Sequence, residues 1–562
     1  MSDTTPESEQ RGAAPEPARA SRAAAAVRRS AAWLLVLALT LIPRLAERPA
    51  FREDNLPPDA AHFLNVARCF ERGQGFSNPS AWPAWMKPAS LPMPETFKEP
   101  GYPFLIAGAA RAGADPFRAG QAISFAAGLL LPFVIALLAR QLTDDPLVPW
   151  LAALIAAGSP LLVDKSNSVL VESLFALIIE LTFLAGAWRL RDPERARRSL
   201  ALDVLTGALF GAAYLLRAQS VLALPSLLLL LPRGRPWRRA LPALMLATAA
   251  ALAVMSPFLA RNLRLFGVPF YSDVTAYGLW PYVDHVTFSH GLDRPGSPIA
   301  FALSHPGPVA AHVIWSLRHF LLAALPRELY GDPLWMLAFA VGLVALWPRR
   351  RDWGFAALYA ALTVGLILAV HWDTYYFTSS MTAWCLIAAA GAVWAARAID
   401  ARWREAAGNR VGRAPRSNAV LVVVALAILG PLVVAIRRPA QLERQIPTEL
   451  EAARHEAPFL RAHLAPGEAA MVNVTSYWAW FTDRPAVHVV VADSARFMDT
   501  VRRLKVRWAA LPTAELPALI AHYPDHRLPG ALEPDHADAA RGIVVYRVVD
   551  PESTAAGRRG IR

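Results

Sequence analysis

Long apolar blocks, separated by shorter charged stretches, dominate the hydrophobic pattern of the chain. The clearest blocks are Ala31–Ile42, Ala119–Leu138, Leu147–Val163, Val169–Ala187, Leu241–Leu259, Leu334–Trp347, Gly354–Val370, Thr378–Ala396 and Ala419–Ala435. A helix needs about 17–25 apolar residues to cross a bilayer core about 30 Å thick. The blocks do not alternate in polarity every second residue, which excludes a transmembrane barrel. The pattern predicts a polytopic α-helical membrane protein.

Two weaker apolar segments are expected to lie along a membrane face instead of crossing. Segment 101–113 is short and carries Arg111, and segment 309–325 carries Arg318 and His319. Two further spans are drawn from residues 201–232. With these assignments we expect about 11–13 transmembrane helices.

Arginine clusters between the blocks orient the predicted spans, because cytoplasmic loops are enriched in Lys and Arg. The clusters are Arg28–Arg29, 189–198, 233–239, 349–351 and 397–416. They place the N-terminus inside, and loops 44–117 and 261–332 and the C-terminal segment outside. Residues 1–30 are expected to be a disordered cytoplasmic segment. The apolar run that follows could be a signal peptide, but the later spans and the absence of an A-x-A site favour an uncleaved anchor.

The chain changes character after residue 437, where the predicted transmembrane domain (31–437) ends. Apolar runs shrink there to strand length, with helix-like stretches such as Ser494–Leu504 between them. The runs are Ala469–Val474, Val487–Val491, Trp508–Leu511 and Ile543–Val548. Residues 438–562 are therefore expected to form a small extracytoplasmic α/β domain.

The amino-acid composition narrows the possible classes of protein further. The net charge is +13, yet only 18% of residues are charged and 55% are hydrophobic. Because the arginines lie between apolar blocks, they indicate membrane topology, and we expect no nucleic-acid partner. Two cysteines in different kinds of segment predict neither a disulfide framework nor a metal cluster.

The first outer loop contains the most informative polar residues. Asp59 opens a stretch in which Phe63, Val66, Ala67 and Phe70 share one helical face, which predicts an amphipathic helix on the membrane. An acid at this position is also a good helix N-cap. The loop closes with 97–103, a stiff Pro-Gly-Tyr-Pro turn that presents Lys98 and Glu99 above the bilayer. Interfacial snorkelling is the alternative role for these two charges.

A series of motifs resembles the GT-C glycosyltransferases. In the first loop they are Asp59-x-x-x-Phe63, Ala67-Arg68, Gly73-x-Gly75-Phe76 and Pro100-Gly101-Tyr102-Pro103. Downstream they are Val169–Ala176 with Glu172, Gly207–Leu216 followed by Arg217, and Pro257–Pro269 with Arg261 and Asn262. This series covers roughly residues 30–275. It is most similar to the bacterial branch that includes protein O-mannosyltransferases and lipid A aminoarabinose transferases.

The resemblance implies an inverting enzyme that moves a hexosyl or pentosyl group from a polyprenyl-phosphate carrier to an envelope acceptor. The acceptor could be a lipid, a glycan or a protein, and the site would face outward from the inner membrane among its lipids. Asp59 would be the general base, and Lys98, Arg217 and Arg261 would neutralise the phosphate leaving group. The substrate-binding set also includes Glu99, Tyr102, Glu172 and Asn262.

Two departures from the family pattern concern a metal and a late span. Ala60 stands where many relatives carry a second acid, which weakens the case for a metal held by an acidic pair. No cofactor is therefore predicted, and the binding of a divalent metal stays an open alternative.

The second departure lies in a late span. Relatives carry Arg-Tyr and a proline where this chain has 371–377, in which His371 and Asp373 could bind substrate hydroxyls. Loop 270–308 mixes aromatic and acidic residues, which suits a sugar face or an aromatic belt.

The C-terminal domain is not expected to be catalytic, although Tyr477, Trp478, Trp480 and Asp483 could touch an acceptor. Two other functions remain: a transporter or flippase of lipid-linked glycans, and a non-catalytic assembly subunit. A transporter would place ionisable residues at mid-span. Here Glu180 is the clear mid-span acid, and the other ionisable residues gather at outer span ends, which favours the enzyme.

Overall fold

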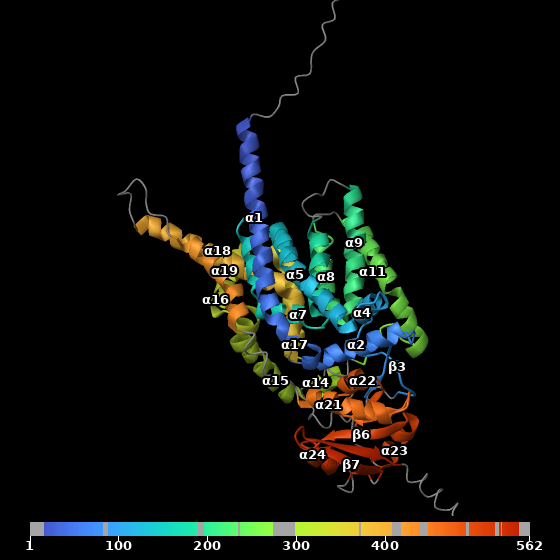
Figure 1. Cartoon of the computed structure of the whole chain (residues 1–562). Helices are drawn as coiled ribbons and strands as arrows, with labels where there is room; N and C mark the ends of the chain where they lie inside the picture. The colour runs from blue at the N-terminus through green and yellow to red at the C-terminus, as the bar shows by residue number, and fades with distance from the viewer. Residues whose placement is uncertain are drawn as a thin grey trace, which may run out of the picture.

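The computed structural model describes residues 16–82, 88–188, 196–233, 237–273, 298–369, 373–406, 418–437, 448–489, 494–522, 528–529 and 531–549. A long helical bundle precedes a compact α/β unit, which lies at one end of the bundle (Figure 1). The early helices are α1 (Glu16–Glu47), α2 (Pro58–Glu71), α4 (Gly101–Arg111), α5 (Pro116–Leu142), α6 (Val148–Ala157), α7 (Pro160–Asn167), α8 (Glu172–Trp188), α9 (Ala196–Leu216), α10 (Leu224–Leu230) and α11 (Trp237–Phe266). The later helices of the bundle are α14 (Pro298–Ser304), α15 (Pro306–His319), α16 (Pro333–Leu346), α17 (Arg350–Ala369), α18 (Met381–Ala406) and α19 (Ala419–Arg437).

Short 3-10 and π segments join several of these helices. They are η1 (Arg48–Ala50), η2 (Glu53–Asn55), η4 (Ala218–Ala223), η6 (Phe320–Leu329), η7 (Trp347–Arg349) and η8 (Thr374–Ser380). Helix α1 begins at Glu16, so residues 16–30 are helical where the sequence predicts disorder. Alanine and arginine have high helix propensity, which explains the early start.

Seven helices in the described ranges are long and apolar enough to cross a membrane, or eight if the bent pair α6–α7 is one span. Several of the predicted blocks fall below the length used for this count: α8 has 17 residues, and Leu200–Leu216 and Ala218–Leu230 are shorter apolar helices. Helices α16 and α17, joined by η7, count together as one candidate from Pro333 to Ala369. The predicted surface helix at 309–325 lies within Pro306–Leu329, which has the length and composition of a span. Segment 101–113, by contrast, forms only the short helix α4.

Glycines let two helix pairs pack backbone against backbone. A Cβ at Gly207 or Gly211 of α9 would overlap the carbonyl oxygens of Ala247 or Ala251 of α11. Small residues four apart on a helix commonly allow such close approach within membranes. The same arrangement joins α16 to α18 through Gly342 and Gly391. The glycines of the motif that precedes Arg217 therefore fix the position of α9.

The C-terminal unit is built on a six-stranded sheet of order β2-β5-β4-β6-β8-β7. Its elements are α21 (Thr448–His463), β4 (Ala469–Val472), α22 (Thr475–Thr482), β5 (Ala486–His488), α23 (Ser494–Arg503), β6 (Val506–Pro512), α24 (Leu516–His522), β7 (Leu532–Asp538) and β8 (Ile543–Val548). Strands β4, β5, β6 and β8 confirm the four predicted runs. The unpredicted β7 is a polar edge strand with most residues exposed or half-buried.

The first strand of this sheet comes from the first outer loop. Strand β2 (Ser80–Ala81) pairs in parallel with β5, with Ser80 opposite Ala486. The loop also contains a small hairpin-like pair, β1 (Ser77–Asn78) and β3 (Met93–Pro94). The described part of the C-terminal unit begins at Thr448, but in space the unit also includes part of loop 44–117.

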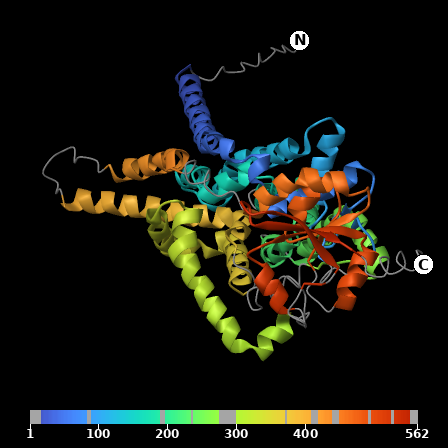
Figure 2. The ribbon, with the colours of Figure 1, turned by 60° about the horizontal axis from the view of Figure 1, so that its bottom comes forward.

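Helix α2 lies between the bundle and the C-terminal unit, as Figure 1 shows. It packs on α4 on one side and on α22 on the other, and most of its residues are buried. Asn65 donates to the carbonyl of Ser476 at 2.8 Å, and Arg68 donates to the carbonyl of Trp480 at 3.1 Å. The predicted membrane-surface helix is thus covered on both sides. Figure 2 shows the sheet lying over only part of this end of the bundle.

Candidate active site

Asp59 lies in the first turn of α2, where Pro57 is the N-cap and Pro58 fills the first helical position. Proline suits that position because its missing N–H would have no helical partner. The Asp59 carboxylate makes no capping bond, which removes the N-cap explanation for this residue. Instead, its Oδ1 lies 2.9 Å from Lys98 Nζ, with the Asp59 side chain 37% exposed and the Lys98 side chain 15% exposed.

The charges around Asp59 keep it ionised. Burial raises the pKa of Asp59, but the Lys98 ion pair, with His62 and Arg217 nearby, lowers it more, so the net pKa falls below the usual value. Asp59 is therefore a carboxylate at neutral pH, able to accept a proton. Because the Asp59 side chain is over a third exposed, a bound hydroxyl group could reach it.

Glu95 fixes the turn that carries Lys98, and sequence reasoning missed it. Its Oε1 accepts from the backbone N–H groups of Phe97 at 2.6 Å and Lys98 at 2.9 Å, and its Oε2 accepts from Asn78 at 2.8 Å. His62 Nε2 lies 2.9 Å from the same oxygen. Burial raises the pKa of Glu95, but His62 and these N–H groups bring it down to about 2. Glu95 thus acts as an internal anion that holds the Lys98 backbone.

Arg217 lies at the end of α9 and pairs with Glu172 at the start of α8. The Glu172 side chain is 2% exposed and the Arg217 side chain is 14% exposed. The guanidinium also lies over two rings of η8, 4.7 Å from the centroid of Tyr376 and 5.1 Å from that of Tyr375. Glu99, from the Lys98 turn, accepts from the backbone N–H of Ala218 at 3.0 Å. The turn, α8, α9 and η8 therefore meet at one place.

A third cation, Lys165, joins this group from α7. Its Nζ lies 2.8 Å from Asp164 and 5.7 Å from the ring centroid of Tyr375. Asp373, just before η8, accepts from the backbone N–H of Tyr375 at 3.3 Å. Burial raises the pKa of Asp373 to about 7, although Lys165 opposes the shift. His371 and Trp372 lie outside the described residues.

The comparisons with known proteins concern the sequence family and the fold. The family model of dolichyl-phosphate-mannose-protein mannosyltransferases matches residues 94–260, a range that includes Lys98, Glu99, Glu172 and Arg217. ArnT from Cupriavidus metallidurans, in the apo state, is 15% identical over 93% of this chain and 98% of its own, with a TM-score of 0.56. The same protein bound to undecaprenyl phosphate is 16% identical over 92% and 98%, with a TM-score of 0.55. The archaeal oligosaccharyltransferase AglB from Archaeoglobus fulgidus is 13% identical over 91% and 74%, with a TM-score of 0.56.

The chain has the GT-C glycosyltransferase fold. Among curated proteins, no sequence matches significantly. The long match to ArnT extends the GT-C resemblance beyond residues 30–275, over which the motifs occur, to the C-terminal unit.

Three predicted substrate-binding residues make hydrogen bonds to other parts of the protein. Tyr102 is fully buried, and its hydroxyl bonds to Gly120 O at 2.9 Å and Ser124 Oγ at 2.7 Å. Arg261 donates to the Phe76 carbonyl at 2.9 Å and lies over the Phe76 ring. Asn262 donates to the carbonyl of Tyr271 at 3.3 Å. These contacts join α4 to α5 and fix the segments around Phe76 and Tyr271, and the substrate-binding role of the three side chains stays a prediction.

The C-terminal residues expected to touch an acceptor fall into two groups. Asp483 and Trp480 have partners within the protein, whereas the Tyr477 hydroxyl has none in the described ranges. Asp483 forms ion pairs with Arg68 at 3.0 Å and Arg72 at 2.8 Å, and the Trp480 indole donates to Glu53 at 2.9 Å. Tyr477 differs: it is 1% exposed, and its hydroxyl has no hydrogen-bond partner within the described ranges. It lies within electrostatic range of Asp59.

Glu180, the mid-span acid, accepts a hydrogen bond within the helical bundle. Its Oε1 accepts from the backbone N–H of Thr382 at 3.0 Å, near the first turn of α18. Helix N-termini favour such anions, because their N–H groups have no helical partner. This contact ties α8 to α18 and gives the acid a structural role, which removes the main sequence feature that favoured a transporter.

Proposed function

We propose that the protein is an inverting glycosyltransferase that uses a polyprenyl-phosphate sugar. The observation that carries the proposal is the meeting of one ionised, accessible carboxylate, Asp59, with the cations Lys98, Arg217 and Lys165 beneath the C-terminal unit. A carboxylate base and a group of cations match the needs of a reaction that deprotonates an acceptor and releases a phosphate. The sugar is a hexose or a pentose, and the acceptor is an envelope lipid, glycan or protein.

The proposed reaction is a single displacement at the anomeric carbon. Asp59 accepts the proton of the acceptor hydroxyl while its oxygen forms the new bond to that carbon. The bond between the carbon and the phosphate oxygen breaks, and the electron pair leaves with polyprenyl phosphate. Arg217 suits the leaving phosphate because its planar fork can bind two oxygens, and its stacking on Tyr375 and Tyr376 holds that fork in place. Fixed charges of this kind stabilise the developing anion without reorganisation.

Recognition of the carrier can be tested without knowing the sugar. The full chain in detergent is titrated with polyprenyl phosphate, and the melting temperature is followed. A ligand at 100 times its Kd adds about 2.7 kcal/mol of stability. We expect stabilisation by polyprenyl phosphate and little by the polyprenol of equal length. Equal stabilisation by both compounds would contradict phosphate recognition.

The site is proposed to face outward from the inner membrane, with the N-terminus cytoplasmic and the C-terminus outside. Helix α5 runs from the α4 end of the bundle to Asp144 and Asp145, where Arg349 and Arg397 pair with these acids at 2.8 and 2.6 Å. These arginines thus lie at the end opposite the site, as the positive-inside rule favours for a cytoplasmic face.

An accessibility tag should report this orientation. Tags at residues 195 and 405 are expected to react only after the membrane is permeabilised. Tags at residues 285 and 500 are expected to react with an impermeant reagent in intact cells. The reverse labelling pattern would place the site in the cytoplasm and contradict the proposal.

Donor binding should weaken as the pH rises through about 7. The reason is Asp373, whose pKa is about 7, so that it is neutral at lower pH and becomes an anion at higher pH. That anion would lie near Lys165 and Asp59 and would repel the donor phosphate. Donor affinity measured between about pH 6 and 8 should therefore fall by up to about tenfold in the wild type, because a charge interaction of about 1.4 kcal/mol is a tenfold change. Asp373→Asn should flatten this dependence, and an unchanged pH dependence in that variant would contradict the assignment.

Tyr477 is proposed to contact the acceptor. Burial raises the pKa of its hydroxyl, which therefore stays protonated and can donate a hydrogen bond. A hydrogen bond contributes about 0.5–1.5 kcal/mol. Tyr477→Phe should therefore raise KM for the acceptor by about threefold to tenfold and leave donor affinity unchanged. Tyr546→Phe, in β8 of the same unit, is the matched control, and an equal KM change in both variants would contradict the contact.

A further inference from the structure

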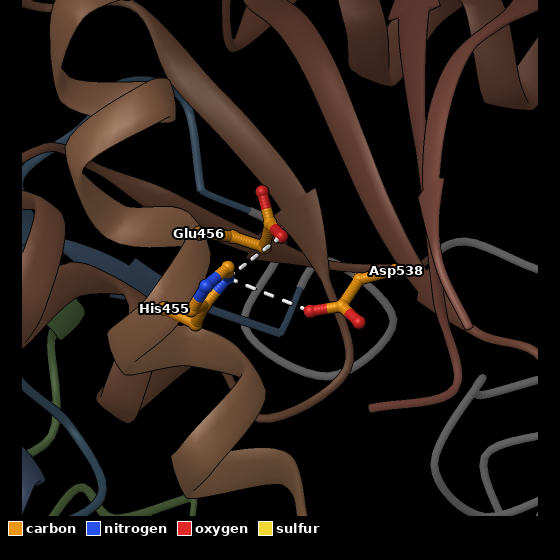
Figure 3. Close-up of side chains that lie close together, drawn as sticks. All are labelled: His455, Glu456 and Asp538. Carbon is orange, nitrogen blue, oxygen red and sulfur yellow. Dashed lines mark hydrogen bonds and ion pairs between the residues drawn. The ribbon is translucent and has the colours of Figure 1, made fainter. Parts of the chain in front are cut away.

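A second group of polar side chains lies in the C-terminal unit, between α21 and the edge strand β7 (Figure 3). His455 and Glu456 come from α21, and Asp538 comes from the end of β7. His455 Nδ1 lies 3.2 Å from Glu456 Oε1 and 3.5 Å from Asp538 Oδ2. The three possible ligand atoms all lie within 4.8 Å of one another. Figure 3 shows the imidazole between the two carboxylates.

These separations suit a tetrahedral metal ion. Zinc binds histidine nitrogen at about 2.0–2.1 Å and carboxylate oxygen at about 2.0–2.2 Å. At the tetrahedral angle, such bonds place two ligand atoms about 3.3–3.6 Å apart. The His455–Glu456 and His455–Asp538 distances lie within about 0.2 Å of that range, so only small side-chain shifts are needed. The longer separation between the carboxylates would have to close on binding.

His536 adds a second imidazole to the group. It precedes Asp538 by two residues on β7, and its Nε2 lies 3.0 Å from Glu456 Oε2. It can therefore orient Glu456 by hydrogen bonding, while its Nδ1 lies 2.9 Å from Asp535. An imidazole nitrogen among the ligands favours zinc and similar transition metals over magnesium or calcium, which prefer oxygen alone. His455 and His536 are 54% and 36% exposed, so an ion can reach them from solvent.

We propose that His455, Glu456 and Asp538 bind one divalent transition-metal ion of the zinc class, with His536 orienting Glu456. The ion would join α21, the first described helix after α19, to β7, which among the described strands pairs with β8 alone. The role is structural and does not depend on the proposed glycosyl transfer. Arg541 is the competing cation: its Nη1 donates to Asp538 Oδ2 at 2.8 Å. An ion at this position must share or displace that contact.

The test uses the full chain in detergent, freed of metal with a chelator and titrated with Co²⁺ and then Zn²⁺. We expect one equivalent of Co²⁺ with the visible absorption of a tetrahedral site, its displacement by Zn²⁺, and a higher melting temperature with Zn²⁺. His455→Ala and Asp538→Asn should each lose that equivalent or bind it at least about tenfold more weakly. His463→Ala is the control, because His463 lies on the same exposed helix and its Nδ1 is 2.8 Å from the Phe459 carbonyl.

The outcomes separate this site from others in the chain. Metal bound near Asp59 would persist in the His455→Ala variant and would appear as a separate equivalent. Because His455 is over half exposed, its removal should leave the melting temperature in chelator unchanged, so the test does not rely on Asp538→Asn folding. If His455→Ala and wild type bind the same amount of Co²⁺ with the same affinity, the proposal is wrong. The cluster is then an ion-pair network neutralised by Arg541 and His536.

Discussion

Asp59→Asn should lower glycosyl transfer by about 10²–10⁴-fold, the usual effect of removing a general base. Asn keeps the size of the side chain and removes its basicity. The helix start should be unaffected, because Asp59 makes no capping bond. The variant should therefore fold and still bind polyprenyl phosphate, which is checked by its melting temperature and by donor titration.

The control for Asp59→Asn is Lys98→Met, which leaves the carboxylate in place. Lys98 pairs with Asp59 at 2.9 Å, so its loss should raise the pKa of Asp59 and weaken phosphate binding without removing the base. Normal turnover in folded Asp59→Asn protein would show that Asp59 is not the base. Glu172 is the competing carboxylate, and Glu172→Gln should be measured in parallel.

Arg217→Gln should cause the second large effect, on stability and on transfer together. Removing one partner of a buried ion pair costs about 3–5 kcal/mol, because the other charge stays buried without a partner. Glu172 is 2% exposed, so it would be that charge. Loss of one group that stabilises a developing anion typically lowers turnover by about 10²–10³-fold.

The double variant Arg217→Gln/Glu172→Gln separates these two effects. It removes both charges, so much of the stability lost in the single variant should return, as judged by melting temperature. Transfer should stay reduced by about 10²–10³-fold, because the phosphate has still lost its guanidinium. Recovery of transfer together with stability would show that Arg217 serves only to neutralise Glu172.

Sequence reasoning could find the residues of the site that lie at the ends of apolar blocks. Asp59, Lys98, Glu99, Glu172 and Arg217 all belong to motifs at predicted outer ends, and the structure brings them together at one end of the bundle. Their catalytic and binding roles remain predictions. Tyr102 and Arg261 belong to the same motifs, and their hydrogen bonds to Gly120 and Phe76 could not be predicted from motif membership.

The remaining parts of the site depend on contacts between distant segments. Asn65 and Ser476 are 411 residues apart, and no local pattern links them. Strand β2 has two residues, too few for any alternation, and it forms only because β5 offers an edge. Glu95 similarly gains its role from backbone N–H groups and from His62, which cannot be read from a loop sequence.

The bends within apolar blocks could not be predicted from the sequence either. A hydrophobic block predicts burial in a membrane, but it does not show where a helix bends or ends. Helices α6 and α7 bend by 55° at Gly158–Ser159, between two apolar runs that read as one block. The proline at 160 ends one helix and begins the next, since proline is tolerated in a first turn.

Reconstitution of the purified chain in liposomes tests the central claim most directly. The liposomes contain polyprenyl-phosphate sugar labelled in the sugar, and extracted envelope material is supplied as acceptor. The account predicts that label moves to the acceptor with inverted anomeric configuration, with one polyprenyl phosphate released for each sugar, and that Asp59→Asn abolishes both. If the intact labelled donor moves to the other leaflet instead, the protein is a transporter. If neither transfer nor movement occurs with donor bound, the protein is a non-catalytic subunit, and the assignment of Asp59 as base is contradicted.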